Sequence, residues 1–266
     1  GAVCVVMVLN GAPVGLALLA ATAAGMLAGL VTGLFHTACG IPAILAGILT
    51  QLALYSVNLR IMGFGTGGGK ANLPISVDKY SLLVSARYVR NVALNNPILI
   101  LVIFCAVLIA VLYWFFGTEL GCSLRATGAN QNMARAQGIN TNVAKVLGLM
   151  ISNGLVALAG GLLAQYQGFS DINMGRGAIV IGLAAVIIGE VIFSRIFRNF
   201  ALKLLSAVIG AIIYYIVMVF VLRLGLSTDD LKLLTALVVA LFLTIPYWKG
   251  KYFTKTSVKK GEKNHA

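Results

Sequence analysis

Few side chains in this sequence could do chemistry, and their spacing does not suit catalysis. There are seven acidic residues, two histidines and four cysteines among 266 residues. The cysteines show no CxxC spacing, and the histidines have no metal ligands beside them in the sequence. No Walker motif, nucleophile–base pair or carboxylate pair is recognisable. The pattern therefore predicts no metal site, no disulfide framework and no enzyme.

One acid lies inside an apolar segment, where an ionisable group is a functional candidate by default. Glu190 is that residue, near the end of segment 178–194, with Arg195 and Arg198 just beyond it. Pairing with these arginines is the favoured alternative to a transport role. Snorkelling to the membrane interface is part of the same alternative. Without a second acid or a histidine in the spans, a proton relay has little support, and Glu190 stays a candidate buried acid.

The composition indicates a chain that lies in a lipid bilayer. Hydrophobic residues make up 60% and charged residues 10% of the sequence, and the mean hydropathy is +0.97. Soluble domains carry about 25% charged residues, and a helix of about 20 apolar residues crosses a bilayer. Because open strand edges are not tolerated in lipid, the sequence predicts an all-α polytopic helical bundle. The predicted spans are 14–35, 42–62, 97–117, 144–165, 178–194, 202–222 and 231–247.

The first nine residues are apolar but too short to span, and a turn at 10–13 follows them. They lack the basic start and the cleavage site of a signal peptide. We expect them to be the second half of an incomplete N-terminal span in a fragment of a longer chain.

Positive charge orients the chain. The net charge is +13, and six lysines follow the last predicted span. The positive-inside rule places this basic tail, 248–266, in the cytoplasm, where anionic lipid rather than nucleic acid is the expected partner. The predicted membrane domain is 1–247. Counting its spans backward, one at a time, from the cytoplasmic tail places 118–143 inside and the loops 63–96 and 166–177 outside.

Small residues recur at every fourth position in three predicted spans, which allows helix backbones to pack closely in lipid. Spans 14–35 and 144–165 run in opposite directions, as an inverted repeat would. The ridges are Ala17, Ala21, Gly25, Gly29 and Gly33; Asn153, Ala157, Gly161 and Ala164; and Ala178, Gly182, Ala185 and Gly189.

Segment 42–62 carries uncharged polar side chains along one side of a helix. They suggest the wall of a water-filled path. Hydrogen bonding between helices, worth about 0.6–2 kcal/mol per contact, is an equal alternative. The candidate path residues are Gly47, Thr50, Gln51, Tyr55, Asn58 and Asn153.

A polar segment separates two apolar spans. Residues 127–137 predict a short helix, with Thr127 as its N-terminal cap and Gly138 at its left-handed C-terminal position. Asn140 or Thr141 starts the next helix, so Gly138 is expected to be a hinge point between a surface helix and a spanning one. The segment lacks the bulky apolar residues and lysines of a lipid-bound helix, which favours docking of another protein.

This segment carries the pattern R-A-T-G-A-N-x-x-x-A-R-x-x-G-I-N, followed by an apolar, glycine-rich span. The pattern resembles the cytoplasmic loop of ABC-importer permeases, in the branch of the ribose and branched-chain amino acid permeases. Residues 41–63 and 162–193 resemble a narrower subgroup of uncharacterised or aromatic amino acid (tryptophan or tyrosine) importers. The resemblance implies a coupling loop at 124–141 that docks the ATP-binding subunit. The implied docking residues are Arg125, Ala126, Gly128, Asn130, Met133, Ala134, Arg135, Gly138, Ile139 and Asn140.

The resemblance also implies the other subunits of the transporter. A solute-binding protein would deliver a small solute, an amino acid and more narrowly an aromatic one, to two permease copies in a homodimer. ATP and Mg²⁺ would bind a separate ATPase, and this chain would hold no cofactor. The implied location is the inner membrane of a bacterium, with several spans and a cytoplasmic C-terminus.

The outward link 168–177 supplies further candidates. Asp171, Asn173 and Arg176 would form an outer gate or meet the binding protein, and an Asp171–Arg176 ion pair is the equal alternative. Two other functions stay open at this point: an ion-coupled secondary transporter, in which Glu190 would be the intramembrane charge, and an ABC permease for a sugar or nucleoside.

Overall fold

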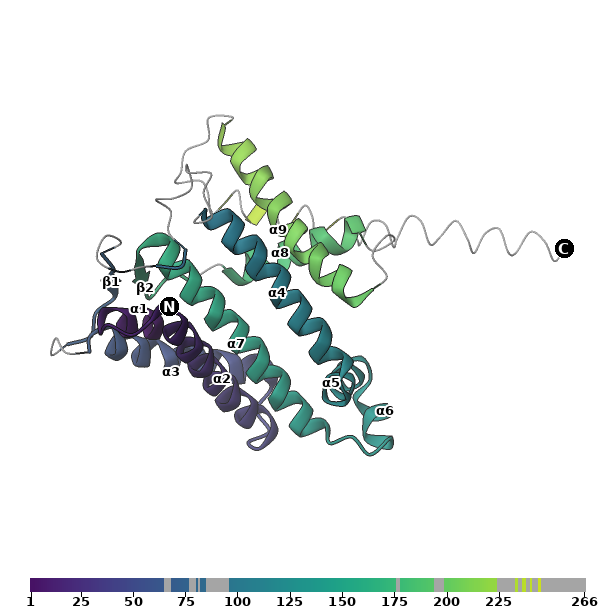
Figure 1. The fold of residues 1–266 in the computed structure, drawn as a ribbon. Coiled ribbons are helices and arrows are strands. Elements are labelled where there is room, and N and C mark those ends of the chain that lie inside the picture. Colours follow the sequence, from purple (N-terminus) through teal and green to yellow (C-terminus); the bar gives the residue numbers. More distant parts are fainter. Residues whose placement is uncertain are drawn as a thin grey trace. The chain divides into compact units, whose positions relative to one another are not determined.

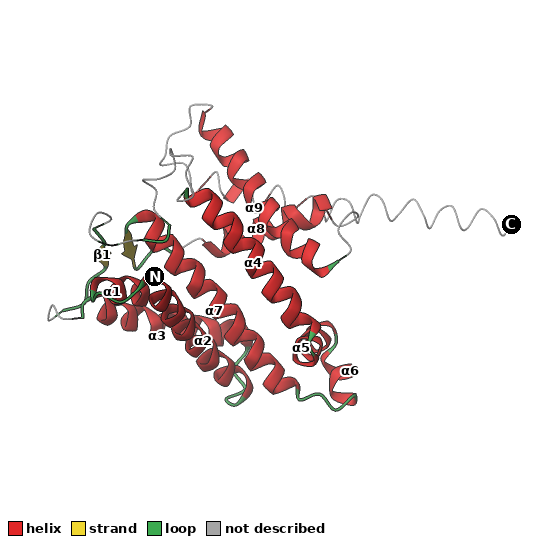
Figure 2. Ribbon diagram, viewed as in Figure 1, coloured by secondary structure: helices red, strands yellow, loops and turns green. Residues whose placement is uncertain are grey.

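The computed structural model describes most of the chain and divides it into two compact units, Gly1–Met174 and Gly175–Ala266. The described residues are 1–64, 68–76, 80, 82–84, 96–175, 178–193, 199–223, 233, 236–237, 240 and 244. Figures 1 and 2 show that this part is almost entirely helical, which confirms the predicted fold class. Each unit is described by itself.

Among the described residues, unit 1 contains seven helices and two short strands, and unit 2 contains two helices. The helices of unit 1 are α1 (Ala2–Leu9), α2 (Val14–Thr37), α3 (Ala43–Met62), α4 (Pro97–Gly117), α5 (Glu119–Ala129), α6 (Gln131–Ala136) and α7 (Thr141–Gln167). Its strands are β1 (Asn72–Pro74) and β2 (Phe169–Asp171), and unit 2 has α8 (Ala178–Phe193) and α9 (Phe200–Arg223).

Within the described residues, five helices are long and apolar enough to cross a membrane: α2, α3, α4, α7 and α9. They confirm five of the seven predicted spans to within a few residues at each end. The sixth, 178–194, forms α8, which has 16 residues and is shorter than a full span. The seventh, 231–247, lies largely outside the described residues.

The long helices begin and end where the sequence supplies the appropriate groups. The Asn96 side chain accepts the amide of Ile98 at 3.0 Å, and Pro97 occupies the first position of α4, where its fixed φ suits a helix. Helix α7 has a glycine at its C-terminal end: Gly168 has a φ of 76°, in the left-handed region. Glycine adopts that conformation without a steric penalty.

Helices α2 and α7 pack side by side and antiparallel (Figure 1). Gly25 faces Ala157, Gly29 faces the Leu149 backbone, and Gly33 faces Val146, so the sequence number rises along α2 as it falls along α7. A Cβ atom at Gly29 would overlap the carbonyl oxygen of Leu149. The predicted small-residue ridge of α2 is therefore confirmed as the surface on which α7 packs.

A hydrophobic core joins one end of these two helices to α1. Cys4 and Val8 of α1 are buried against Leu18 of α2 and Leu162 of α7. Val84, from the loop before α4, is buried in the same cluster, and α4 contributes partly buried residues to it. The cluster connects α1, α2, α4 and α7 with the loop before α4, near the C-terminal end of α7.

Unit 2 repeats the close antiparallel packing on a smaller scale. Gly189 of α8 faces the backbone of Ser206, and Gly210 of α9 faces that of Ala185. The other half of the predicted α8 ridge is not used in this way: a Cβ atom at Gly182 would meet nothing within 4 Å. The residue four positions earlier, Ala178, is exposed.

Candidate coupling segment and transport path

The polar segment forms two helices instead of the single helix expected over 127–137. Asn130 has an extended backbone (φ −152°, ψ 103°) between α5 and α6, and its side-chain oxygen accepts the amide of Met133 at 3.1 Å. Thr127 lies inside α5, where its hydroxyl donates to the Ser123 carbonyl at 2.8 Å. The predicted cap at Thr127 is therefore wrong, and the cap is Asn130.

The turn after α6 was predicted correctly. Gly138 has a φ of +82°; its amide donates to the Arg135 carbonyl, and the amide of Ile139 donates to the Ala134 carbonyl, both at 3.0 Å. This pair of bonds is a Schellman motif, which closes a helix end and requires a left-handed residue.

The link from α6 into α7 turns at Gly138, and side chains brace it on both sides. Movement about Gly138 stays a prediction. The Asn140 side chain caps α7 by accepting the amides of Asn142 at 3.2 Å and Val143 at 3.3 Å. Across the turn, Nε of Arg135 donates to the Thr141 hydroxyl at 2.9 Å. A side-chain cap, a closed helix end and a bridging side chain leave little freedom in four connecting residues.

The predicted docking residues differ in exposure. Ala134 is fully buried, so it seats α6 on the molecule and cannot contact a partner, contrary to expectation. Met133 beside it is 48% exposed. Two further members are half-buried, Ala126 and Ile139, and the exposed members are Arg125, Gly128, Asn130, Met133, Arg135, Gly138 and Asn140.

Two of the candidate path residues lie in helix contacts. Thr50 is 6% exposed, and its hydroxyl accepts a 2.9 Å hydrogen bond from the Thr32 hydroxyl of α2. The Asn153 side chain donates to the Leu149 carbonyl at 2.9 Å on its own helix, and the Asn153 backbone lies against Gly25. For Thr50, the alternative of an interhelical hydrogen bond holds.

The remaining candidate path residues all lie on α3. Gln51 and Tyr55 are exposed and Asn58 is half-buried, while a Cβ atom at Gly47 would meet nothing within 4 Å. These four residues form the polar stripe along one side of α3.

The two loops predicted to face outward meet in a small antiparallel sheet, which the sequence did not reveal. Asn72 pairs with Asp171, and Pro74 pairs with Phe169. Strands of three residues show no usable alternation of polar and apolar positions. Of the predicted gate residues, Asp171 accepts the amide of Asn173 at 2.7 Å. Arg176 and the proposed ion pair lie outside the described residues.

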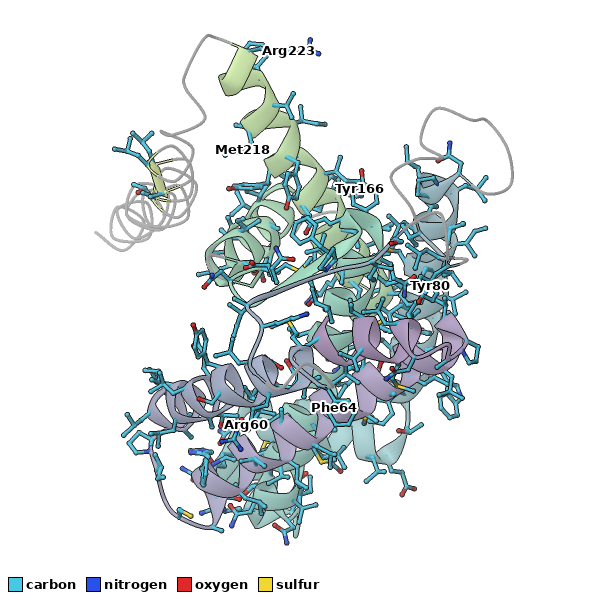
Figure 3. All side chains as sticks on the ribbon, turned by 90° about the vertical axis from the view of Figure 1, so that its left-hand side faces the viewer. Arg60, Phe64, Tyr80, Tyr166, Met218 and Arg223 are labelled. Atoms are coloured by element: carbon cyan, nitrogen blue, oxygen red, sulfur yellow. The ribbon has the colours of Figure 1, made fainter. Side chains whose placement is uncertain are left out.

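A buried amide beside this sheet was also missed. Gln165 is fully buried; its Oε1 accepts the amide of Leu83 at 3.2 Å, and its Nε2 donates to the Cys4 sulfur at 3.4 Å. Nearby, the Tyr80 hydroxyl donates to the Leu9 carbonyl at 3.2 Å (Figure 3). These bonds fasten the described part of loop 63–96 to α1 and α7.

Glu190 is exposed within its own unit, on α8. Its burial in the membrane stays a prediction, and its pairing with Arg195 or Arg198 lies outside the described residues. Among the described residues, no group of three or more His, Cys, Asp or Glu side chains could hold a metal ion.

Residues 1–245 match the model of a protein family described as the permease component of branched-chain amino acid transport systems. The chain belongs to that family. It is thus an ABC transport permease and not an enzyme, and membership sets aside the ion-coupled secondary transporter. A permease of this family works with an ATPase, which uses the ATP, and with a solute-binding protein. The chain is a multi-pass membrane protein of a bacterial transport family.

Individual relatives agree with this membership. The permease is 41% identical to the tyrosine transport system permease protein of Clostridioides difficile (strain R20291), over 88% of this chain and 74% of that protein. It is 35% identical to an uncharacterized protein of Rickettsia prowazekii (strain Madrid E), over 86% and 78% of the two chains. It is 30% identical to the autoinducer 2 import system permease protein LsrC of Salmonella typhimurium, over 70% and 50%. No solved structure matches the chain.

Proposed function

We propose that this permease imports an amino acid with an aromatic side chain. The supporting observation is the 41% identity to a tyrosine transport permease over 88% of the chain. Helix α3 carries uncharged polar side chains and no buried acid or base. A path lined by this helix would suit a zwitterionic solute better than an ion.

The ATPase docks on α6 and its flanks in this proposal. Met133 presents an apolar side chain on a short helix of small and polar residues, and Arg125 and Arg135 add positive charge. Small residues allow a partner to approach closely, and one exposed apolar anchor is typical of an interface centre. The proposed contacts are the exposed residues Arg125, Gly128, Asn130, Met133, Arg135, Gly138 and Asn140.

The transport path runs along α3 in this proposal. Its wall consists of Gly47, Gln51, Tyr55 and Asn58, the polar stripe along one side of α3. A stripe on one helix face is half of a channel, and a second copy of the chain supplies the other half in a homodimer.

The two ends of α7 face opposite sides of the membrane in this proposal. The α6 segment and the basic tail face the cytoplasm, while the β1–β2 sheet faces outward. Asp171, Asn173 and Arg176 there meet the solute-binding protein or form the outer gate.

Copurification tests the docking surface. The full-length permease is co-expressed with the ATPase encoded beside its gene, solubilised and captured through a tag on the permease. Met133→Asp should lower the affinity for the ATPase by about thirtyfold or more, because truncating or charging an interface anchor costs about 2 kcal/mol or more. Cys39→Asp is the matched control, since Cys39 is exposed in the α2–α3 turn on the same proposed side. Capture that is equal in both variants would place docking elsewhere.

Uptake tests the solute. Proteoliposomes that contain the permease, its ATPase and its binding protein should accumulate tyrosine or tryptophan when ATP is supplied. Leucine and ribose, which represent solutes of the other branches of the superfamily, are added as competitors for this uptake. Uptake blocked by ribose and indifferent to excess tyrosine would contradict an aromatic amino acid as the solute.

A further inference from the structure

Arg135 on α6 and Thr141 on α7 are joined across the turn between the two helices. The guanidinium Nε donates to the Thr141 hydroxyl at 2.9 Å. Thr141 is 2% exposed, whereas Arg135 is exposed, so the bond runs from a surface helix into the packed first turn of a spanning helix. A hydrogen bond donated by a charged group is about twice as strong as one between neutral groups.

The backbone on both sides of this bond is already closed. Gly138 and Ile139 complete the hydrogen bonds at the end of α6, and Asn140 completes those at the start of α7. With both ends closed, the motion left to α6 is a rotation about the short link. The Arg135–Thr141 bond lies across the link and opposes that rotation.

Beyond Thr141, α7 leads directly into the tightest helix contact of unit 1. Gly33 faces Val146 and Gly29 faces Leu149, within the first turns of α7. Backbones that touch without intervening side chains move together, because a close-packed contact has no soft element to absorb a displacement. The α6 segment lies at the opposite end of α7 from the β1–β2 sheet (Figure 1).

A further bond carries the connection to the proposed path. The Thr32 hydroxyl of α2 donates to Thr50 of α3 at 2.9 Å. Gln51, the next residue along α3, is exposed on the polar stripe. A continuous series of contacts therefore runs from α6 through α7 and α2 to α3.

We infer that Arg135 and Thr141 are positioning residues that make α6 and α7 move as one rigid body during transport. The inference rests on the proposed function, in which the ATPase docks on α6. When the ATPase closes, the bond prevents α6 from turning in place, and the displacement passes to α7. Without the bond, the complex would still form and hydrolyse ATP but would move little solute for each ATP consumed.

Thr141 variants in the reconstituted full-length complex test this inference. Thr141→Val keeps the shape of the side chain and removes the hydroxyl, while Thr141→Ser keeps the hydroxyl. Thr127→Val is the matched control, because Thr127 is a buried threonine whose hydroxyl donates to the Ser123 carbonyl of its own helix. The measured quantity is labelled tyrosine taken up per ATP hydrolysed.

We expect Thr141→Val to lower uptake per ATP by about tenfold or more, in line with the loss of one charge-assisted hydrogen bond. Its ATPase capture and basal ATP hydrolysis should persist, and Thr141→Ser and Thr127→Val should transport like the wild type. Unchanged uptake per ATP in Thr141→Val would overturn the inference, as would equal impairment of the Val and Ser variants. Failure of Thr141→Val to assemble, with Thr127→Val assembled, would also overturn it by giving Thr141 a folding role.

A second readout does not depend on the identity of the solute. Gln51→Cys is labelled from the aqueous phase with a thiol reagent, in a background where the exposed Cys39 and Cys122 are serines. ATP should change the labelling rate in this background, and Thr141→Val should abolish the change. A response to ATP that survives in Thr141→Val would overturn the inference. If the wild-type permease captures no ATPase, it is the proposed function that fails.

Discussion

The hydroxyl of Thr32 on α2 donates a 2.9 Å hydrogen bond to the hydroxyl of Thr50 on α3. Thr50 in turn donates to the Ala46 carbonyl of its own helix at 2.9 Å, so its hydroxyl serves both helices. Both residues are less than 10% exposed. In lipid, such a bond is one of the few directional forces between helices, because the hydrophobic effect does not drive spanning helices together.

Removing this bond should loosen α3 from α2. Thr50→Val keeps the side-chain shape, and we expect it to lower the free energy of unfolding by about 0.6–1.7 kcal/mol, the range for interhelical hydrogen bonds in membranes. The measurement is denaturant unfolding of the purified permease in detergent.

The matched control is Thr22→Val. The Thr22 hydroxyl donates at 2.8 Å to the Leu18 carbonyl of its own helix, so the difference between the two variants isolates the bond between helices. Equal destabilisation by both would show that the Thr32–Thr50 bond adds nothing.

The glycine contact between α2 and α7 should tolerate no added side chain. Gly29→Ala would place a Cβ atom against the Leu149 carbonyl and 2.7 Å from Cα of Met150, and backbone atoms cannot rotate away. We expect it to lower the midpoint of thermal unfolding, with a cost of about 1–3 kcal/mol.

Gly15→Ala on the same helix is its control. A Cβ atom there would meet nothing within 4 Å, and alanine favours the helix. An equal loss of stability in both variants would mean that α2 needs its glycines for a reason other than contact with α7.

Much of this contact could be predicted from the sequence. The glycines at every fourth position of α2 define one face regardless of context, because a helix places such residues on one side. The apolar segments likewise predict α2, α3, α4, α7 and α9, since the length of each is set by the bilayer.

What could not be predicted depends on contacts distant in the sequence or on small local differences. The β1–β2 sheet joins residues about a hundred positions apart, and the burial of Gln165 depends on a loop from elsewhere in the chain. Thr127 and Asn130 are both good caps, and whether α5 runs past Thr127 is decided by its packing. The extended conformation of Asn130 then determines where α6 begins.

The buried amide of Gln165 should hold the loop before α4 in place. Gln165→Leu removes the oxygen that accepts the Leu83 amide, and the loss of one such hydrogen bond costs about 0.5–1.5 kcal/mol. We expect much faster hydrogen exchange at Leu83, together with a lower unfolding midpoint.

Gln167→Leu is a suitable comparison because Gln167 is exposed two residues further along α7. It should leave exchange at Leu83 unchanged. Slow exchange at Leu83 in Gln165→Leu would mean that the loop is held without this bond.

The left-handed conformation of Gly138 should make the end of α6 sensitive to any side chain. Gly138 has a φ of +82°, and a Cβ atom is disfavoured there by about 1–2 kcal/mol. Because the amide of Ile139 completes the turn by donating to Ala134, we expect Gly138→Ala to speed hydrogen exchange at Ile139 by about fivefold or more. Gly138→Asn should have a smaller effect, since asparagine tolerates this conformation better than alanine.

The matched control for this change is Gly128→Ala in α5. A Cβ atom at Gly128 meets nothing within 4 Å, and Gly128 is not among the glycines with positive φ. This variant should therefore leave exchange at Ile139 unchanged. If alanine and asparagine at position 138 gave the same rate as glycine, the closed end of α6 would not depend on a left-handed residue. The bracing of α6 against α7 would then have to come from the Arg135–Thr141 bond and the Asn140 cap.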